Sequence, residues 1–333
     1  MNNSRFILLA RFSAKKHNIF PLLYNKIALS MDEQAQQTRR GIILALAAYT
    51  MWGIAPVYFK SLQHVSALEI LSHRVIWSFF FLAGLIGLRR HWSKVSTVMR
   101  QPKMLGLLAL TSVLVGSNWL IFIWAINNNY MLDASLGYYI NPLFNVVLAM
   151  VFLGERLRPL QWVAVSLAAC GVLVQLIKFG SLPWIALALA ATFACYGLLR
   201  KKVNLDAQTG LFIETCLLLP VAASYVLLIA DTPTSNWALN PTSTNLLLMA
   251  AGIVTTVPLL CFTGAATKLR FSTLGFFQYI GPSLMFILAV TVYGEAFTLD
   301  KGITFGFIWA GLMIFSADGL RTHRHNKKQI PTG

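Results

Sequence analysis

Tyr139-Ile140-Asn141-Pro142 begins an apolar run that ends at Gly154-Glu155, and the chain repeats this stretch as Tyr279-Ile280-Gly281-Pro282 running to Gly294-Glu295. The distance from the proline to the Gly-Glu pair is the same in both copies. A repeat of this length indicates two homologous halves, which we expect to join near residues 178–183. With small shifts in spacing, the correspondence extends to Gly171 with Gly311, Leu136–Tyr139 with Leu274–Phe277, and Tyr49–Gly53 with Phe193–Gly197.

The composition is that of a membrane protein. Of 333 residues, 57% are hydrophobic and only 11% are charged, whereas soluble domains carry roughly 25% charged residues. So much apolar surface does not fit inside a water-soluble core, and lipid is therefore the expected solvent.

Ten apolar segments follow in order, each close to the roughly 20 residues that cross a bilayer as a helix. Peptide groups in hydrocarbon must be hydrogen-bonded within the chain, so every segment should be helical. The sequence therefore predicts an all-α membrane protein with ten transmembrane helices. They are expected at residues 41–60, 68–88, 104–126, 133–152, 159–177, 183–199, 209–230, 244–264, 272–293 and 302–320.

Basic residues mark one side of the membrane. They cluster before the first segment, in the loops after segments 2, 4, 6 and 8, and in the tail; of 27 Lys and Arg residues, only Lys60, Arg74, Lys178 and Lys301 lie elsewhere. Because positive charge is retained in the cytoplasm, we expect a multi-pass protein of the bacterial cytoplasmic (inner) membrane with both termini cytoplasmic. The net charge of +16 then reflects topology, and no nucleic-acid partner is expected.

Each half contains five helices, an odd number, so the second half must enter the membrane upside down relative to the first. The charges agree: Arg156 and Arg158 follow Glu155, whereas Ala296 and Thr298 follow Glu295. Inverted repeats of this kind are typical of transporters. We predict residues 39–177 as the first repeat, with helices 1–5, and residues 178–320 as the second, with helices 6–10.

Residues 1–38 and 321–333 are predicted as a cytoplasmic amino-terminal extension and a cytoplasmic basic tail. Phe6–Ala10 is too short for the apolar core of a signal peptide, and Pro21 interrupts the next cluster. Two interpretations of the extension stay open. Translation starts at Met31, or the segment is a basic arm that lies on anionic lipid.

The spacing from proline to Gly-Glu, with Gln161-Trp162 and Cys170-Gly171-Val172 after its first copy, resembles the EamA domain of the drug/metabolite transporter superfamily. Within it, the chain resembles the RarD group, which is named for a chloramphenicol-sensitivity phenotype. This resemblance covers about residues 36–318 and implies a substrate cavity between helices 1–4 and 6–9, with helices 5 and 10 at the periphery. It is carried by Trp52–Pro56, Ser72–Trp77, Asn118-Trp119 with Trp124–Asn127, and Phe276–Pro282.

Ionisable residues inside membrane helices are candidate functional groups. Arg74 lies in predicted helix 2 next to His73, and Glu69 lies one helical turn from His73 on the same face. We interpret Arg74 and His73 as a pair that binds an anion or carboxylate in a cavity. The alternative is structural: Glu69 contacts His73, and Arg74 is bound to neighbouring backbone.

Glu214 takes the position of Arg74 in the second repeat. Low dielectric disfavours a charged carboxylate, which suits a group that carries protons, so Glu214 is the candidate for proton coupling. The alternative is a partner for a helix-end donor near the cytoplasmic face. Because the repeats are inverted, a direct ion pair between Arg74 and Glu214 is not required.

Aromatic and amide residues are the candidates for the cavity walls, because small-molecule sites combine apolar walls with a few directed polar groups. Trp and Tyr also gather at headgroup depth, so an interfacial role is the alternative. Pro142 and Pro282 are the candidates for helix breaks or gating, because proline removes a backbone hydrogen bond; Pro56 and Pro258 do the same. The wall candidates are Tyr49, Trp52, Asn118, Trp119, Tyr138, Tyr139, Asn141, Phe277, Gln278 and Tyr279, with His73 and Arg74.

Other features are interpreted as structural. The four cysteines lack C-x-x-C spacing and are expected to be buried small apolar residues. Glu155 and Glu295 should cap or pair locally, and His323 with His325 belongs to a solvated tail rather than a metal site. Gly302-x-x-x-Gly306 and Ala164-x-x-x-Ala168 permit close helix packing, either within the chain or in a dimer.

The leading functional hypothesis is a secondary active transporter of a small organic metabolite or drug that works by alternating access, with proton-coupled efflux as one form. A non-transporting membrane scaffold or receptor subunit and an intramembrane enzyme are the alternatives. The chain has no Walker motif and no H-E-x-x-H or G-x-S-x-G motif, so we expect no ATP-driven step, no enzyme activity, no cofactor and no metal. The expected partners are a small-molecule substrate, the lipid bilayer and, in the coupled form, protons. Monomer and homodimer both stay open.

Overall fold

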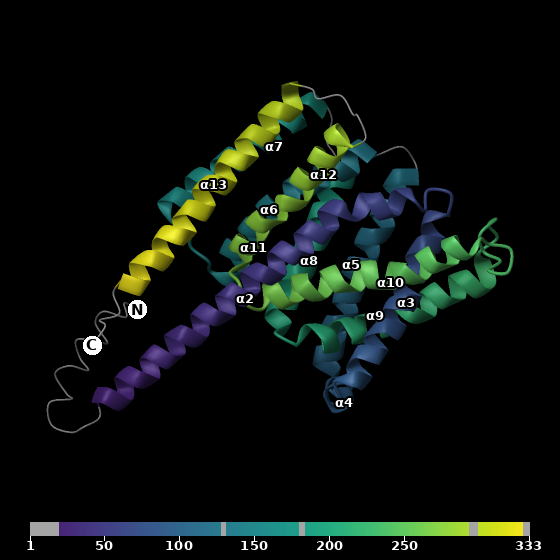
Figure 1. The fold of residues 1–333 in the computed structure, drawn as a ribbon, viewed down its shortest axis with the longest axis horizontal. Coiled ribbons are helices and arrows are strands. Elements are labelled where there is room, and N and C mark those ends of the chain that lie inside the picture. Colours follow the sequence, from purple (N-terminus) through teal and green to yellow (C-terminus); the bar gives the residue numbers. More distant parts are fainter. Residues whose placement is uncertain (1–19, 128–130, 180–183, 293–298, 329–333) are drawn as a thin grey trace.

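The computed structural model describes residues 20–127, 131–179, 184–292 and 299–328, and within these ranges every regular element is a helix (Figure 1). A short π-helix, η2, continues α9. The elements are α2 (Phe20–Lys60), α3 (Ala67–Leu88), α4 (Trp92–Met99), α5 (Pro102–Asn127), α6 (Met131–Leu153), α7 (Pro159–Phe179), α8 (Trp184–Val203), α9 (Ala207–Ser224), η2 (Tyr225–Ile229), α10 (Thr242–Ala266), α11 (Phe271–Gln278), α12 (Ile280–Thr291) and α13 (Leu299–Lys328).

The bundle has the surface of a membrane protein. In the described part of the chain, nine helical spans are long and apolar enough to cross a bilayer, and Gly137–Leu153 in α6 is a shorter apolar helix. Large apolar side chains such as Leu228, Val151 and Ile177 are mostly exposed. Water disfavours such a surface and lipid does not. The predicted ten-helix membrane fold is confirmed.

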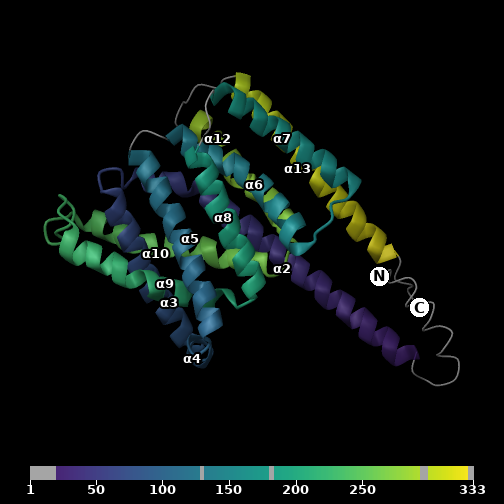
Figure 2. The ribbon, with the colours of Figure 1, turned by 180° about the vertical axis from the view of Figure 1, so that it is seen from behind.

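Contacts between a helix of one half and a helix of the other recur between the equivalent helices with the halves swapped, as expected for an inverted repeat. The contact of α6 with α8 recurs as that of α12 with α2, and the contact of α5 with α8 recurs as that of α10 with α2. Helices in equivalent positions also meet each other: α3 meets α9, α6 meets α11, and α7 meets α13. Helices α7 and α13 lie side by side at one edge of the bundle in both views (Figures 1 and 2), the position that the family resemblance implies for helices 5 and 10.

Two equivalent glycines show this symmetry at atomic detail. A Cβ atom on Gly171 would lie 3.0 Å from the carbonyl oxygen of Thr304, and one on Gly311 would lie 2.9 Å from that of Ala164. Both positions therefore require glycine, because the α7 and α13 backbones touch there. Ala164 and Ala168 thus pack within the chain, whereas a Cβ atom on Gly306 would meet nothing within 4 Å.

The structure differs from the sequence prediction in three elements. Helix α2 begins at Phe20, well before the apolar segment, since residues 31–40 are mostly good helix formers without Gly or Pro. The loop after α3 contains the short helix α4. The ninth predicted helix is interrupted at Tyr279, so that α11 and α12 meet two residues before Gly281-Pro282.

Candidate functional site

A central cavity of about 160 Å³ lies between the two halves of the bundle. Helices α2, α3, α5 and α6 line it from the first half, and α8, α10, α11 and α12 from the second. This is the location that the family resemblance implies, except that α9 contributes no lining residue. The described lining residues are Tyr49, Trp52, Ala55, Pro56, Phe59, Arg74, Asn118, Trp119, Phe122, Gly137, Tyr138, Asn141, Leu189, Phe193, Thr255, Leu259, Gln278, Gly281, Pro282 and Met285.

Arg74 is the one charged side chain among these described lining residues. Its Nε donates a hydrogen bond to Thr255 Oγ1 at 2.7 Å. Its guanidinium carbon lies 4.9 Å from the Trp119 ring centroid and 5.4 Å from that of Phe59. Aromatic faces attract a cation over distances up to roughly 6 Å. These contacts fix the guanidinium plane without neutralising its charge.

Buried amides form a polar network beside the cavity. Asn141 Nδ2 donates to the carbonyl oxygen of Ala190 at 3.0 Å, and Asn118 Nδ2 donates to that of Leu189 at 2.9 Å. Asn145 Nδ2 donates to Asn141 Oδ1 at 3.2 Å and to Gln278 Oε1 at 3.0 Å. The network therefore joins α6 to both α8 and α11 and holds the amides of Asn141 and Gln278 at the cavity wall.

His73 and Glu69 lie away from the cavity, in the contact between α3 and the loop before α10. Glu69 Oε2 accepts hydrogen bonds from Thr232 Oγ1 at 2.5 Å and Thr234 Oγ1 at 2.8 Å. The His73 ring packs against Trp237 with 5.3 Å between centroids. Arg74 and His73 therefore do not form one site, since successive helical residues point in different directions. The structure records no hydrogen bond between Glu69 and His73, and the carboxylate instead holds this loop.

The other predicted wall residues divide between packing and the helix break. Tyr139 packs on Phe305, Phe277 is partly buried against the main apolar core, and Tyr279 donates from its hydroxyl to the carbonyl oxygen of Tyr139 at 3.3 Å. Pro282 lies beside the break between α11 and α12, whereas Pro142 lies inside the continuous helix α6. Each proline leaves the carbonyl four residues earlier without its helical donor. Those carbonyls belong to Tyr138 and Gln278, two cavity residues.

Glu214 is buried in a polar cluster between α5, α8 and α9. Its carboxylate accepts from Thr111 Oγ1 at 2.5 Å and from the Tyr196 hydroxyl at 3.3 Å, and it lies 3.6 Å from Arg200 Nη1. The sequence prediction placed Arg200 in a cytoplasmic loop, and this was wrong. Arg200 lies inside α8 with its side chain 1% exposed, because a buried carboxylate stabilises a buried guanidinium.

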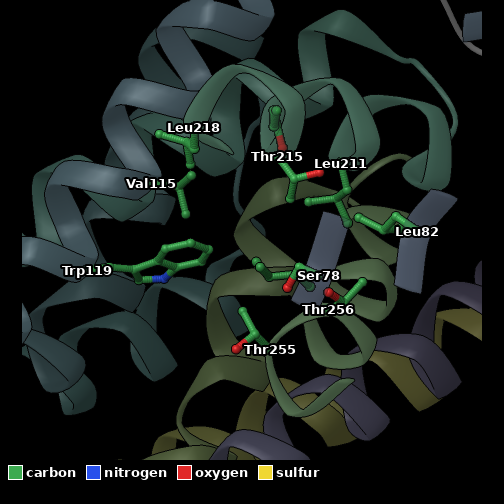
Figure 3. A pocket seen from close by; sticks show the side chains of 11 residues that line it. Ser78, Leu82, Val115, Trp119, Leu211, Thr215, Leu218, Thr255 and Thr256 are labelled. Atoms are coloured by element: carbon green, nitrogen blue, oxygen red, sulfur yellow. The ribbon is translucent and has the colours of Figure 1, made fainter. Parts of the chain in front are cut away.

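Glu214 lines a second, water-sized void of about 20 Å³. The void shares Trp119, Thr255 and Leu259 with the cavity wall. Figure 3 shows Trp119 on one side and Ser78, Thr255 and Thr256 on the other. A void of this size holds about one water molecule when polar groups surround it.

The repeated Gly-Glu pair has a definite task in its first copy. Gly154, with a φ of +61°, ends α6 in the left-handed conformation that is common just after a helix, and the Glu155 amide donates to the carbonyl oxygen of Ala149 at 3.0 Å. The Glu155 carboxylate then accepts from the Phe271 amide at 2.7 Å and from the Ser272 amide at 3.2 Å. The expected capping role is confirmed, but the capped helix α11 belongs to the other half, so the partner is not local as expected. Glu295 lies outside the described residues.

Some residues of the site were missed from sequence. Phe193 is the repeat counterpart of Tyr49, and that correspondence could have identified it. Phe59, Phe122 and Thr255 carry no such signal. The cysteines are free, but the expectation that they are buried was wrong: Cys170 is exposed on α7 and the other three are partly exposed, because much of the helix surface faces lipid.

Comparison with known proteins agrees with this architecture. Residues 39–177 match the EamA-like transporter family. An uncharacterised transporter of Vibrio cholerae is 66% identical over 87% of this chain and 96% of its own length. Protein RarD of Salmonella typhimurium is 64% identical over 87% of this chain and 99% of its own length. A crystal structure with 19% sequence identity shares the fold, with a TM-score of 0.61 over 82% of this chain and 96% of that one.

Proposed function

We propose a function from the premise that this chain belongs to the RarD group of the EamA-like transporter family. It is a secondary active transporter that moves a small organic molecule by alternating access through the central cavity. Membership of this family, together with the apolar helices, makes the chain a multi-pass inner-membrane transporter of the drug/metabolite superfamily.

One observation carries the proposal: the cavity is lined by helices of both inverted halves, and polar contacts join the halves beside the loop that carries Glu155. The Glu155 cap on α11 and the hydrogen bond from Arg270 Nη2 to the carbonyl oxygen of Arg156, at 2.7 Å, both link the halves there. Alternating access requires these contacts to break when the cavity opens on this side.

The basic loops support a cytoplasmic location for the Glu155 contacts and for both termini. Thiol labelling of single cysteines introduced beside Glu155 and Glu295 tests this topology. The first should be accessible from the cytoplasm and the second from outside; accessibility from the same compartment would contradict the inverted repeat.

The proposed substrate contacts are the predicted residues that line the cavity: Tyr49, Trp52, Arg74, Asn118, Trp119, Tyr138, Asn141 and Gln278. Pro142 and Pro282 are proposed to permit bending of their helices during the exchange. Glu214 does not line the cavity, and its proposed role in proton coupling is supported by the void that it lines together with Thr255 and Trp119.

Flux measurements test the function. Purified protein in liposomes should exchange solutes from a mixed metabolite panel, measured by mass spectrometry of the lumen with and without a pH gradient. Arg74→Gln should abolish that flux, while Lys202→Gln, which removes an exposed cytoplasmic charge, should not. If Glu214 carries protons, Glu214→Gln should abolish the effect of the gradient per folded molecule. No flux for any solute would contradict the proposal and favour a scaffold.

A further inference from the structure

The uncompensated charge of Arg74 makes the cavity electrically positive. We infer that the cavity binds small monoanions with an aromatic body, and carboxylates in particular, with Arg74 as the anchor of the carboxylate. This inference rests on the proposed function for its biological meaning, but it makes a claim about binding that is measured without transport.

The first step concerns the guanidinium. Thr255 Oγ1 accepts a hydrogen bond from Arg74 Nε, and the rings of Trp119 and Phe59 lie near the guanidinium carbon of Arg74. The described structure gives Arg74 no salt bridge and no hydrogen bond from its two Nη groups. Planar guanidinium groups bind carboxylates through two parallel hydrogen bonds. The Nη groups are therefore the donors that Arg74 retains for a ligand.

The second step concerns the counter-charge. No Asp or Glu is among the described residues that line the cavity. Glu214 lines the neighbouring void, and its carboxylate is already paired with Arg200. An unpaired cation in a poorly hydrated site is costly, and an anionic ligand removes that cost. A cationic ligand increases it.

The third step concerns the rest of the ligand. Tyr138 lines the same cavity as Arg74, and its hydroxyl is a second donor for an anion. Away from Arg74, the wall is aromatic: Trp52 and Phe193 meet edge to face at 5.8 Å between centroids, and Tyr49 packs on Trp52 at 5.7 Å. This wall favours an aromatic or other flat apolar body.

Binding to the full chain, purified in a neutral detergent, tests the inference by isothermal titration. The probes are 3-phenylpropionate, its neutral amide 3-phenylpropionamide and the cation 3-phenylpropylamine, which share one aromatic body. We expect the carboxylate to bind at least tenfold more tightly than the amide, and the amine to bind most weakly. Arg74→Gln should remove the preference for the carboxylate, Arg74→Lys should retain part of it, and Lys202→Gln should leave it unchanged.

Equal binding of the amide or the amine by the native chain would overturn the inference, as would binding of none of the three. A preference that survives in Arg74→Gln would place the anion elsewhere and overturn it too. Arg74→Lys keeps the test open if Arg74→Gln fails to fold. Phosphatidylglycerol added to the micelles should not compete, and competition would show that a lipid headgroup occupies the cavity. Carboxylate binding without any flux would leave this inference intact and contradict only the transport proposal.

Discussion

The buried pair of Arg200 and Glu214 allows a sharp prediction about stability. The two side chains are 1% and 2% exposed, and Nη1 of Arg200 lies 3.6 Å from Oε1 of Glu214. Removal of one partner leaves the other charge buried without compensation, which costs about 3–5 kcal/mol. We therefore expect Glu214→Gln and Arg200→Gln each to destabilise the chain by roughly this amount.

The two variants should differ in size and in pH dependence. A guanidinium cannot release its proton, so Glu214→Gln leaves a permanent buried charge and should lie near the upper end, about 5 kcal/mol. In Arg200→Gln the carboxyl group keeps Thr111 and Tyr196 as donors and can bind a proton. Its cost should be about 3 kcal/mol and should decrease as the pH falls, because protonation removes the unpaired charge.

Unfolding in mixed micelles with increasing sodium dodecyl sulfate, followed by far-ultraviolet circular dichroism near pH 8 and near pH 5, measures these free energies. The double variant Arg200→Gln/Glu214→Gln should cost less than the sum of the single variants by about 2 kcal/mol. Single variants that each cost below about 1 kcal/mol, or strictly additive costs, would refute the reasoning that this pair holds α8 and α9 together.

Two further predictions concern contacts between the halves. Gly311→Ala should cost about 1–3 kcal/mol in the same unfolding measurement, because its Cβ would lie 2.9 Å from the carbonyl oxygen of Ala164. Gly306→Ala on the same helix meets nothing within 4 Å and is the matched control; equal costs would contradict close packing at Gly311. Glu155→Gln should weaken the cap of α11 by about 0.5–2 kcal/mol and speed hydrogen exchange of the Phe271 and Ser272 amides, which donate to this carboxylate. Unchanged exchange there would exclude the cap as a link between the halves.

Sequence patterns predicted the elements that depend on local chemistry. The lengths of the apolar segments predicted the membrane helices closely, since a single segment that crosses hydrocarbon can satisfy its backbone hydrogen bonds only as a helix. The residues whose repeat positions coincide, such as Gly171 and Gly311, proved to lie at equivalent contacts. Of the predicted wall residues, those on α2 and α5 line the cavity, as do Tyr138, Asn141 and Gln278, because they lie on the faces that meet the other half.

The remaining predictions depended on which face each helix turns to its neighbours. His73 and Arg74 are adjacent in sequence, yet α3 turns one towards the loop before α10 and the other into the cavity. Phe277 and Gln278 separate in the same way, one into the apolar core and the other onto the wall.

The sequence by itself determined the solvent, the number of membrane helices and the presence of two related halves, because apolar length and repeated motifs are properties of the chain alone. Only the tertiary structure decided that Glu214 pairs with Arg200, that Glu155 caps a helix of the other half, and that Arg74 faces the cavity without a carboxylate. A charge in a low-dielectric interior is stabilised by whatever lies within a few ångströms of it. Those neighbours come from helices that are far apart in sequence.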